Sequence, residues 1–529
     1  MKNNLTHVNF NKNISTMQLR MQFDVDTYIP EHSKVRLVCN IVEEMNLNSI
    51  LSTYSILGRK PVVDPVTMLK ILFFCYSEGI RSSRKIRDFC IFDLRAHFLL
   101  QYCKPPSYST VNRFRKGLED FAPDLLNQFV EILYDDGHVD LENIYIDGTK
   151  IESLAGRYTF VWRKSVLSYQ KKLQERVIKE QNLPENSSLD FVAKHVEREF
   201  NRIRNYCSSK SIAFVHGIGH HKSQEQKDYE YFKDILDKFE KYREHLMLMG
   251  DRNSYSKTDH DATFMRMKDD HMKNGQLKPG YNMQFASNGA FIVGVMGSHK
   301  ANDLHTLRPF LEQMLPRFGN RVTRIVADAG YESVENYAFL KVNGLMSFIK
   351  PVNHETSKRK KSKSDIGKRE NMLYLEKEDA YECKNGKKLT RDKDRIKKYD
   401  SGYEDTTRVY SCNECAGCQH NSACIKSKKE EGGTKKTLQF SPAFEEYRRQ
   451  SHQNITSDVG IIQRLNRSIQ AEGMFSKLKG GLRYDRFSHR GMKSVVSDLI
   501  LMAIGINLNK LYSKKCNKQT GVIEYTKTA

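Results

Sequence analysis

Apolar residues along this chain follow patterns that predict helices first, then strands, and then helices inserted between strands. Up to about residue 135 the pattern is helical, and one helix is expected to begin at Asp64-Pro65, a capping residue followed by a first-turn proline. Residues 142 to 162 read as strands around an Asp-Gly pair. From 163 to 250, apolar residues recur at helical spacing among charges, which predicts a long helical hairpin inserted between strands.

Strand character returns after residue 280. The stretch from 281 to 298 contains a Ser-Asn-Gly turn sequence and predicts a β-hairpin. A helix is expected over 303 to 317, and "RVTRIVADAGYES" (321–333) then reads as a buried strand. Near the other end, "DVGIIQRLNRSIQAEGMFSKLKGGL" predicts one helix that is closed by its two glycines.

Two of the predicted strands end on an aspartate. Asp147 follows the apolar run of "ENIYIDGTK" (142–150), and Asp328 follows the run of 321–333. A carboxylate at the end of a buried strand is unfavourable unless it is paired or binds a cation. Each of the two could also simply form a turn or cap a helix.

The last long helix adds a third carboxylate, Glu472, among basic residues. Three carboxylates in one cleft repel each other, and Mg²⁺ or Mn²⁺ would relieve the repulsion, because these hard ions take carboxylate and phosphate oxygens. Two such ions support phosphodiester cleavage and strand transfer, which are one chemistry with different nucleophiles. The three acids together therefore predict a nucleic-acid enzyme.

The charge of the chain indicates a polyanionic partner. Its 529 residues include 86 Lys and Arg against 64 Asp and Glu, which leaves a net charge of +22 at pH 7. No apolar run is long enough to span a bilayer, and the N-terminal residues lack the apolar core of a secretory signal. A soluble, cytoplasmic protein that associates with DNA is therefore expected.

Several basic residues and the single tryptophan are candidate DNA contacts. "PPSYSTVNRFRKGL" (105–118) predicts a short basic helix, either in a helix-turn-helix or as an ordinary solvated face. Further basic residues surround and follow Glu472, and the tryptophan could stack on a flipped base, although a packing role is more common. These candidates are Arg113, Arg115, Lys116, Trp162, Arg467, Lys477, Lys479, Arg483 and Arg486.

A cysteine-rich stretch predicts a metal site. "YSCNECAGCQHNSAC" spaces Cys412, Cys415, Cys418 and Cys424 as C-x2-C-x2-C-x5-C, which favours a tetrahedral thiolate site for structural Zn²⁺. Cys383 could replace one of the four, and an iron-sulfur cluster or free thiols are the alternatives. The surrounding segment looks too small and polar for a core of its own, so zinc would fold it.

The order of these features resembles the ribonuclease-H-like fold of DDE transposases. That order is a strand ending in Asp, a hairpin, a helix, a second strand ending in Asp, an insertion, and a helix with Glu. The segments "DPVTMLKILFFCYSEGIRSSRKIRDF", "STVNRFRK", "IDGTKIES", "KPGYNMQ", "VADAGYES" and "AEGMFSKLKGGLRYDRFSHRG" extend the resemblance over nearly the whole chain. They are similar to transposases of the insertion-sequence 1182 group, which is related to the insertion-sequence 4 group.

The resemblance implies that Asp147, Asp328 and Glu472 form the catalytic triad. Related transposases carry a Tyr and an Arg seven and four residues before the glutamate, and a Lys seven residues after it. Lys479 matches that pattern. The two earlier positions hold Leu465 and Ser468 instead, and Arg467 is one place out of register.

The expected fold class is a multidomain α+β protein. A helical N-terminal DNA-binding region is expected over 1–135, followed by the first part of a ribonuclease-H-like α/β core. The first part of the core is expected over 140–350 and includes the helical insertion at about 163–255. The basic and cysteine-rich insertion is expected over 351–440, and the C-terminal helices of the core over 441–515.

The resemblance further implies a DNA transposase. Such an enzyme would bind the terminal inverted repeats of an insertion sequence, cut the double-stranded DNA, join the freed ends to target DNA, and act as a homodimer that pairs two ends. Two alternatives stay open: a ribonuclease-H-like nuclease without strand transfer, and a non-catalytic, zinc-containing DNA-binding protein.

Overall fold

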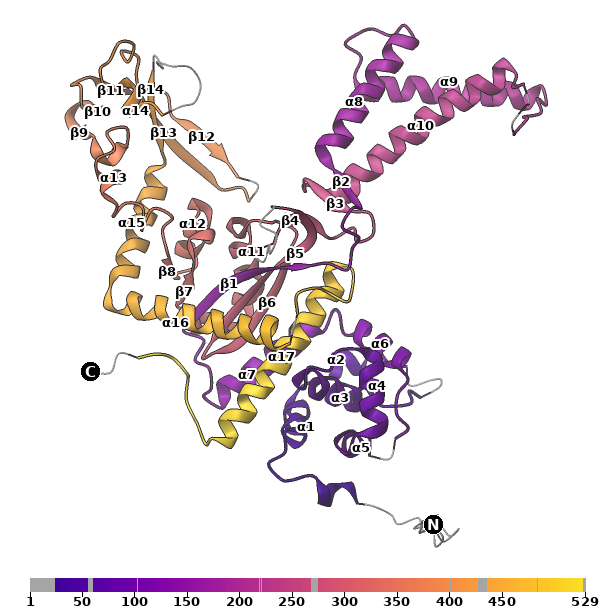
Figure 1. Cartoon of the computed structure of the whole chain (residues 1–529), viewed down its shortest axis with the longest axis vertical. Coiled ribbons are helices and arrows are strands. Elements are labelled where there is room, and N and C mark those ends of the chain that lie inside the picture. Colours follow the sequence, from indigo (N-terminus) through magenta and orange to yellow (C-terminus); the bar gives the residue numbers. More distant parts are fainter. Residues whose placement is uncertain are drawn as a thin grey trace, which may run out of the picture. The chain divides into compact units, whose positions relative to one another are not determined.

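The computed structural model is a mixed α+β protein (Figure 1). It describes residues 24–55, 60–101, 103–217, 219, 221–267, 275–399, 401–426, 435–482 and 484–526. The chain divides into two compact units, Met1–Arg115 and Lys116–Ala529, each of which is described by itself.

The first unit is helical, as its apolar pattern predicts. Asp64 caps α3 by accepting a hydrogen bond from the Thr67 amide at 2.9 Å, and Pro65 is the first helical residue, which confirms the predicted start. The helix then buries nine of its thirteen side chains. The unit contains η1 (Val25–Tyr28), α1 (Lys34–Glu44), α2 (Asn48–Leu51), α3 (Pro65–Ser77), α4 (Ser83–Phe92), α5 (Leu94–Leu100) and most of α6 (Tyr108–Gly117).

The second unit is built on a six-stranded sheet. Its order is β4-β5-β1-β7-β8, and β6 also pairs with β5. β5 runs antiparallel to β1, whereas β7 runs parallel to both β1 and β8. β5 and β6 form the predicted hairpin. The strands are β1 (Asn143–Glu152), β4 (Thr263–Arg266), β5 (Leu277–Asn288), β6 (Phe291–Ser298), β7 (Arg324–Ala327) and β8 (Met346–Ile349).

Helices pack on this sheet from distant parts of the sequence. α16 (Asp458–Phe475) lies along β1 and β7, and α15 (Pro442–Thr456) packs against β8 (Figure 1). α17 (Met492–Cys516) packs on β6 together with α7 (Ala122–Asp135). α17 is long and apolar enough to cross a membrane, yet 78% of its apolar window is buried inside the protein, as expected for a core helix. Two further helices of this unit are α11 (Leu307–Phe318) and α12 (Val334–Val342).

Long charged helices lie between β1 and β4, as predicted. The short strands β2 (Phe160–Trp162) and β3 (Ser254–Ser256) pair antiparallel at the base of this insertion. The insertion contains three helices rather than a simple hairpin: α8 (Arg163–Glu180), α9 (Leu189–Ser209) and α10 (Gln224–Met249). Phe232, Ile235 and Phe239 of the predicted apolar stripe are buried against the other two helices.

The cysteine-rich segment forms a second six-stranded sheet, which the sequence did not predict. Tyr381, Leu389, Tyr410, Cys412 and Leu438 pack into a small core of its own, so the expectation of a coreless segment is wrong. The reason is that short strands collect a few apolar side chains on one face. The elements are α13 (Lys360–Lys363), β9 (Leu373–Leu375), β10 (Ala380–Glu382), β11 (Lys388–Arg391), β12 (Arg395–Lys398), β13 (Glu404–Cys412), α14 (Asn421–Cys424) and β14 (Lys436–Phe440).

Candidate active site

The parallel pairing of β1 and β7 brings the two predicted aspartates together. Tyr145 pairs with Val326, and Asp147 and Asp328 each lie two residues beyond that pair. The Arg467 Nη2 atom, from α16, lies 3.2 Å from Asp147 Oδ2 and 3.5 Å from Asp328 Oδ2. Two carboxylates that are 181 positions apart in the sequence therefore converge on one positive charge.

Each aspartate uses its other oxygen to hold the local backbone. Asp147 Oδ1 accepts a hydrogen bond from the Gly148 amide at 2.8 Å. Asp328 Oδ1 accepts one from the Gly330 amide at 2.8 Å and thereby caps the short helix η4 (Ala329–Tyr331). The capping role that the sequence offered as an alternative is thus present, and the Oδ2 atoms remain directed at Arg467. β1 continues past Asp147 to Glu152, so the prediction that this aspartate ends its strand is wrong, whereas Asp328 does follow the end of β7. The two carboxylates together suit a cation between β1 and the end of β7.

A third aspartate lies beside this pair, and sequence reasoning missed it. Asp303 Oδ1 accepts hydrogen bonds from Asn282 Nδ2 at 2.8 Å and Gln284 Nε2 at 3.0 Å, both on β5. Gln284 Oε1 in turn accepts a hydrogen bond from the buried Tyr331 hydroxyl. A usable signal existed, because Asp303 also follows the end of a predicted strand, at the start of the helix expected over 303–317.

The pKa of Tyr331 reflects the negative charges of the site. Burial raises the pKa of its hydroxyl well above the ordinary value, and the negative charges of Asp303, Asp147 and Asp328 raise it further. Tyr331 is therefore a neutral hydrogen-bond donor at physiological pH.

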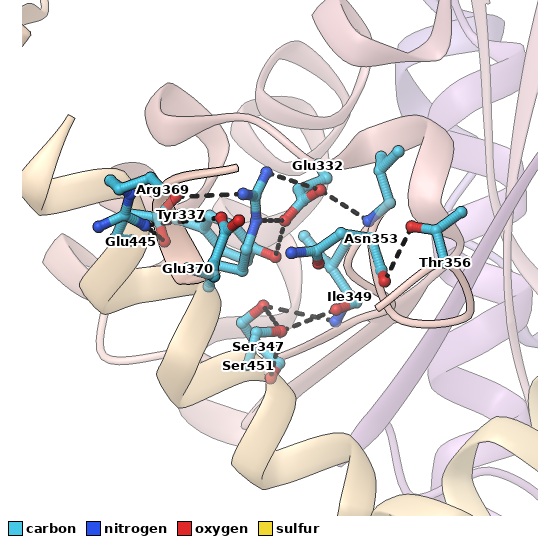
Figure 2. Close-up of polar contacts among 12 residues, drawn as sticks. Glu332, Tyr337, Ser347, Ile349, Asn353, Thr356, Arg369, Glu370, Glu445 and Ser451 are labelled. Carbon is cyan, nitrogen blue, oxygen red and sulfur yellow. Dashed lines mark hydrogen bonds and ion pairs between the residues drawn. The ribbon is translucent and has the colours of Figure 1, made fainter. Parts of the chain in front are cut away.

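A buried ion pair anchors the residues that follow Asp328, and Figure 2 shows Glu332, its carboxylate member, among its polar contacts. Glu332 has a side chain that is 1% exposed and pairs with Arg448 of α15 at 2.8 Å. It also accepts hydrogen bonds from the Val352 amide at 2.8 Å and the Tyr337 hydroxyl at 3.3 Å. A buried carboxylate needs such partners, and here they join the turn after β7 to the helix that precedes α16.

Glu472 lies on α16 but is exposed, and its carboxylate has no hydrogen-bond or ion-pair partner among the described residues. Arg467 and Glu472 are five residues apart, which separates them by roughly 140° around an α-helix. They therefore project from different faces. The helix changes to π-helical geometry at η7 (Ser476–Gly481), directly after α16. The structure brings Asp147, Asp328 and Arg467 together, and the participation of Glu472 stays a prediction.

The two aspartates suit magnesium, although no larger ligand set is assembled. Among the described residues, no three His, Cys, Asp or Glu side chains are arranged to hold a metal ion. Mg²⁺ commonly binds one or two carboxylates and completes its shell with water and substrate phosphate. The converging Oδ2 atoms of Asp147 and Asp328 provide such a pair.

On α6, the three basic candidates differ in exposure. Arg113 and Lys116 are exposed. Arg115 is buried and donates hydrogen bonds to the Tyr76 hydroxyl at 3.0 Å and to the Arg81 carbonyl at 2.9 Å, so its guanidinium serves the packing of the helices.

The other DNA-contact candidates also have distinct surroundings. Lys477 is exposed and Lys479 half-buried within η7. Arg486 donates hydrogen bonds to the backbone carbonyls of Ser153 and Ala155, each at 3.0 Å, and so stabilises the turn after β1. Trp162 packs against Phe160 and Phe264 with ring centroids 5.9 Å away in both cases. Arg483 lies outside the described residues.

All five cysteines of the predicted metal site face one cavity in the second sheet. Cys383, Cys412, Cys415, Cys418 and Cys424 line it together with His420. Burial raises the pKa of the Cys415 thiol to about 11, and it also raises the pKa of Cys424. Without a bound cation these two thiols are therefore protonated at neutral pH.

Two segments of the chain match transposase families. Residues 382–512 match the Transposase DDE domain, a range that contains Arg467 and Glu472. Residues 23–117 match the Transposase domain (DUF772), which covers the helices of the first unit. No curated protein matches the chain. Together, the two family matches support a DNA transposase of the DDE family.

Proposed function

We propose that this protein is a metal-dependent transposase that cuts the ends of an insertion sequence and joins them to target DNA, with Asp147, Asp328 and Glu472 as its catalytic acids. The observation that carries the proposal is the convergence on Arg467 of the Oδ2 atoms of Asp147, within β1, and of Asp328, directly after the parallel strand β7. Bound Mg²⁺ or Mn²⁺ ions supply activation of a water or 3′-hydroxyl and stabilisation of the leaving oxygen.

The main sheet supports a ribonuclease-H-like core. An antiparallel hairpin, β5 and β6, lies on one side of β1, and the parallel strands β7 and β8 lie on the other. This arrangement puts Asp147 on the central strand β1 and Asp328 directly after its parallel neighbour β7. The motifs quoted from the sequence favour the insertion-sequence 1182 group within the family.

In this proposal the chain's own residues bind and orient DNA. Arg113 and Lys116 of α6 contact the terminal repeats, and Lys477 and Lys479 hold phosphates close to α16. A homodimer is required because two element ends must be paired before they are joined. The net charge of +22 supports a DNA partner in general.

The test compares Asp147→Asn, Asp328→Asn and Glu472→Gln with the wild-type protein. The substrate is a duplex that carries the inverted repeats from the DNA flanking the gene, with Mg²⁺ or Mn²⁺ and a supercoiled target plasmid. We expect each variant to bind the duplex normally and to lose cleavage by at least 10³-fold, about 4 kcal/mol in the barrier. Asp237→Asn, at an exposed position on α10, is the matched control and is expected to cleave normally.

The products separate the alternatives. Joined plasmid product from a pre-cleaved end supports a transposase, whereas cleavage without joining supports the nuclease. Full cleavage by Asp147→Asn excludes the proposed site, and binding without any cleavage by the wild type supports the non-catalytic DNA-binding protein.

We also propose that the cysteine cavity holds structural zinc. Five thiols line it, which is one more than a tetrahedral shell needs, and four of them would have to close around Zn²⁺, which would displace the thiol protons that burial retains. The site lies next to the small core of the second sheet, since Cys412 belongs to that core and Cys383 and Cys415 pack against it.

A further inference from the structure

Asp303 occupies a position from which it reaches both the β1 backbone next to Asp147 and the turn of Asp328. It begins η2 (Asp303–His305), in the connection that follows the β6 hairpin strand. The two β5 side chains that donate to it belong to the part of β5 that pairs with β1, where Gln284 faces Gly148 and Asn282 faces Lys150. The β1–β5 register therefore places Asp303 beside Gly148, the residue that follows Asp147.

Two glycines leave the space that the Asp303 carboxylate fills. A Cβ atom on Gly148 would lie 2.9 Å from Asp303 Oδ1 and 2.6 Å from Gln284 Nε2, closer than real Cβ atoms approach. A Cβ atom on Gly330 would lie 3.5 Å from Asp303 Oδ2 and 3.0 Å from Asp328 Oδ1. The Asp303 side chain thus lies between the backbone that follows Asp147 and the backbone that follows Asp328.

The charge of Asp303 is not balanced locally. Among the described residues, no Lys, Arg or His side chain forms an ion pair with it, while Arg467 pairs only with Asp147 and Asp328. Asp147, Asp328 and Asp303 place three carboxylates close together, and in a partly buried site the repulsion between them favours a bound cation.

We propose that Asp303 is a positioning residue of the cation site, which holds the β1 backbone next to Asp147 and the turn of Asp328 through Gln284 and strengthens divalent-cation binding by its negative charge. This inference rests on the proposed function. It adds a residue outside the predicted triad and explains why glycine follows both aspartates closely.

The first experiment measures Mn²⁺ binding to the full-length protein by electron paramagnetic resonance. Asp303→Asn retains the acceptor oxygen for Gln284 and Asn282 but removes the charge, so we expect at least tenfold weaker binding at an unchanged unfolding temperature. Asp237→Asn is the matched control and is expected to bind as the wild type does. Wild-type affinity in Asp303→Asn overturns the inference.

A second experiment needs no variant. Fe²⁺ bound in place of Mg²⁺, with ascorbate and peroxide, cleaves the backbone near the ion, and mass spectrometry locates the cuts. We expect cuts next to Asp303 as well as next to Asp147 and Asp328, and the absence of cuts at Asp303 overturns the inference. If Asp147→Asn loses Mn²⁺ binding while Asp303→Asn does not, only the role of Asp303 fails. If the wild type binds no Mn²⁺, the proposed catalytic site fails as well.

Discussion

Arg467 places a guanidinium nitrogen between the Asp147 and Asp328 oxygens that are best placed to bind a cation. The arginine and a divalent ion therefore compete for the same two oxygens. We expect Arg467→Gln to bind Mn²⁺ about tenfold more tightly than the wild type, which corresponds to roughly 1.4 kcal/mol of binding free energy. Arg467→Lys keeps the charge and serves as the control, with an affinity near that of the wild type. Weaker Mn²⁺ binding by Arg467→Gln would show that the arginine supports the ion instead.

At the scale of single residues, the sequence singles out Asp147 and Asp328 because each follows an apolar run, and the register of β1 with β7 brings them close together. Asp328 does follow the end of β7, but β1 continues past Asp147 to Glu152 because its pairing with β5 extends that far. Asp303 also follows a predicted strand, but its place beside the other two aspartates could not be predicted, because its partners are Asn282 and Gln284 and their position depends on the pairing of β1 with β5. The contact of Arg467 is equally invisible in the sequence, since it follows from how α16 lies along the sheet.

At the scale of elements, the C-terminal segment is tied to β1 and α16 near the candidate site. The Tyr145 hydroxyl donates to Glu524 at 3.0 Å, and the Tyr525 amide donates to Asn466 at 2.7 Å. Burial, and then the nearby charges of Asp140 and Glu142, raise the pKa of Glu524 to about 7 from its ordinary 4.5.

A folded-state pKa above the unfolded value means that the docked segment prefers protonated Glu524. Its contribution to docking is full below about pH 4.5 and is lost as the pH rises through about 7. We expect the hydrogen-exchange protection factor of the Tyr525 amide to fall severalfold between pH 5.5 and about 8.5. Glu524→Gln should remove this dependence, whereas Glu197→Gln, at an exposed position on α9, should retain it. Equal protection at both pH values in the wild type would contradict the assignment.

Element prediction succeeds where local chemistry decides the structure. The cap at Asp64 and the hairpin turn between β5 and β6 are both present as expected. The helix predicted around Glu472 is α-helical only as far as Phe475, the end of α16. The π-helix η7 then follows and extends to Gly481. Leu478 is buried within this π-helix, and no local pattern in the sequence indicates the change of hydrogen bonding.

At the scale of the whole molecule, the cysteine-rich sheet interrupts the chain between β8 and α15. β8 ends at Ile349 and α15 begins at Pro442, so every residue of α16 follows the insertion. α15 also packs against β13 of the second sheet. The composition of the sequence predicts this insertion but not its strands. Short, mostly polar strands pair through contacts between the strands, and these contacts leave no local pattern in the sequence.

Zinc in that sheet would therefore affect the stability of the protein beyond the insertion. We expect about one Zn²⁺ per full-length chain by elemental analysis, and a lower unfolding temperature after chelation, because a structural zinc site contributes to folding. Cys412→Ser and Cys424→Ser should lose the metal, while Cys516→Ser, an exposed cysteine outside the cavity, should retain it. Comparison of Cys383→Ser with Cys418→Ser identifies the fourth ligand, since the spare thiol can be replaced without loss of zinc. A metal-free protein whose unfolding temperature is unaffected by chelator or added Zn²⁺ would show that the small core alone folds this sheet and that its thiols are not ligands.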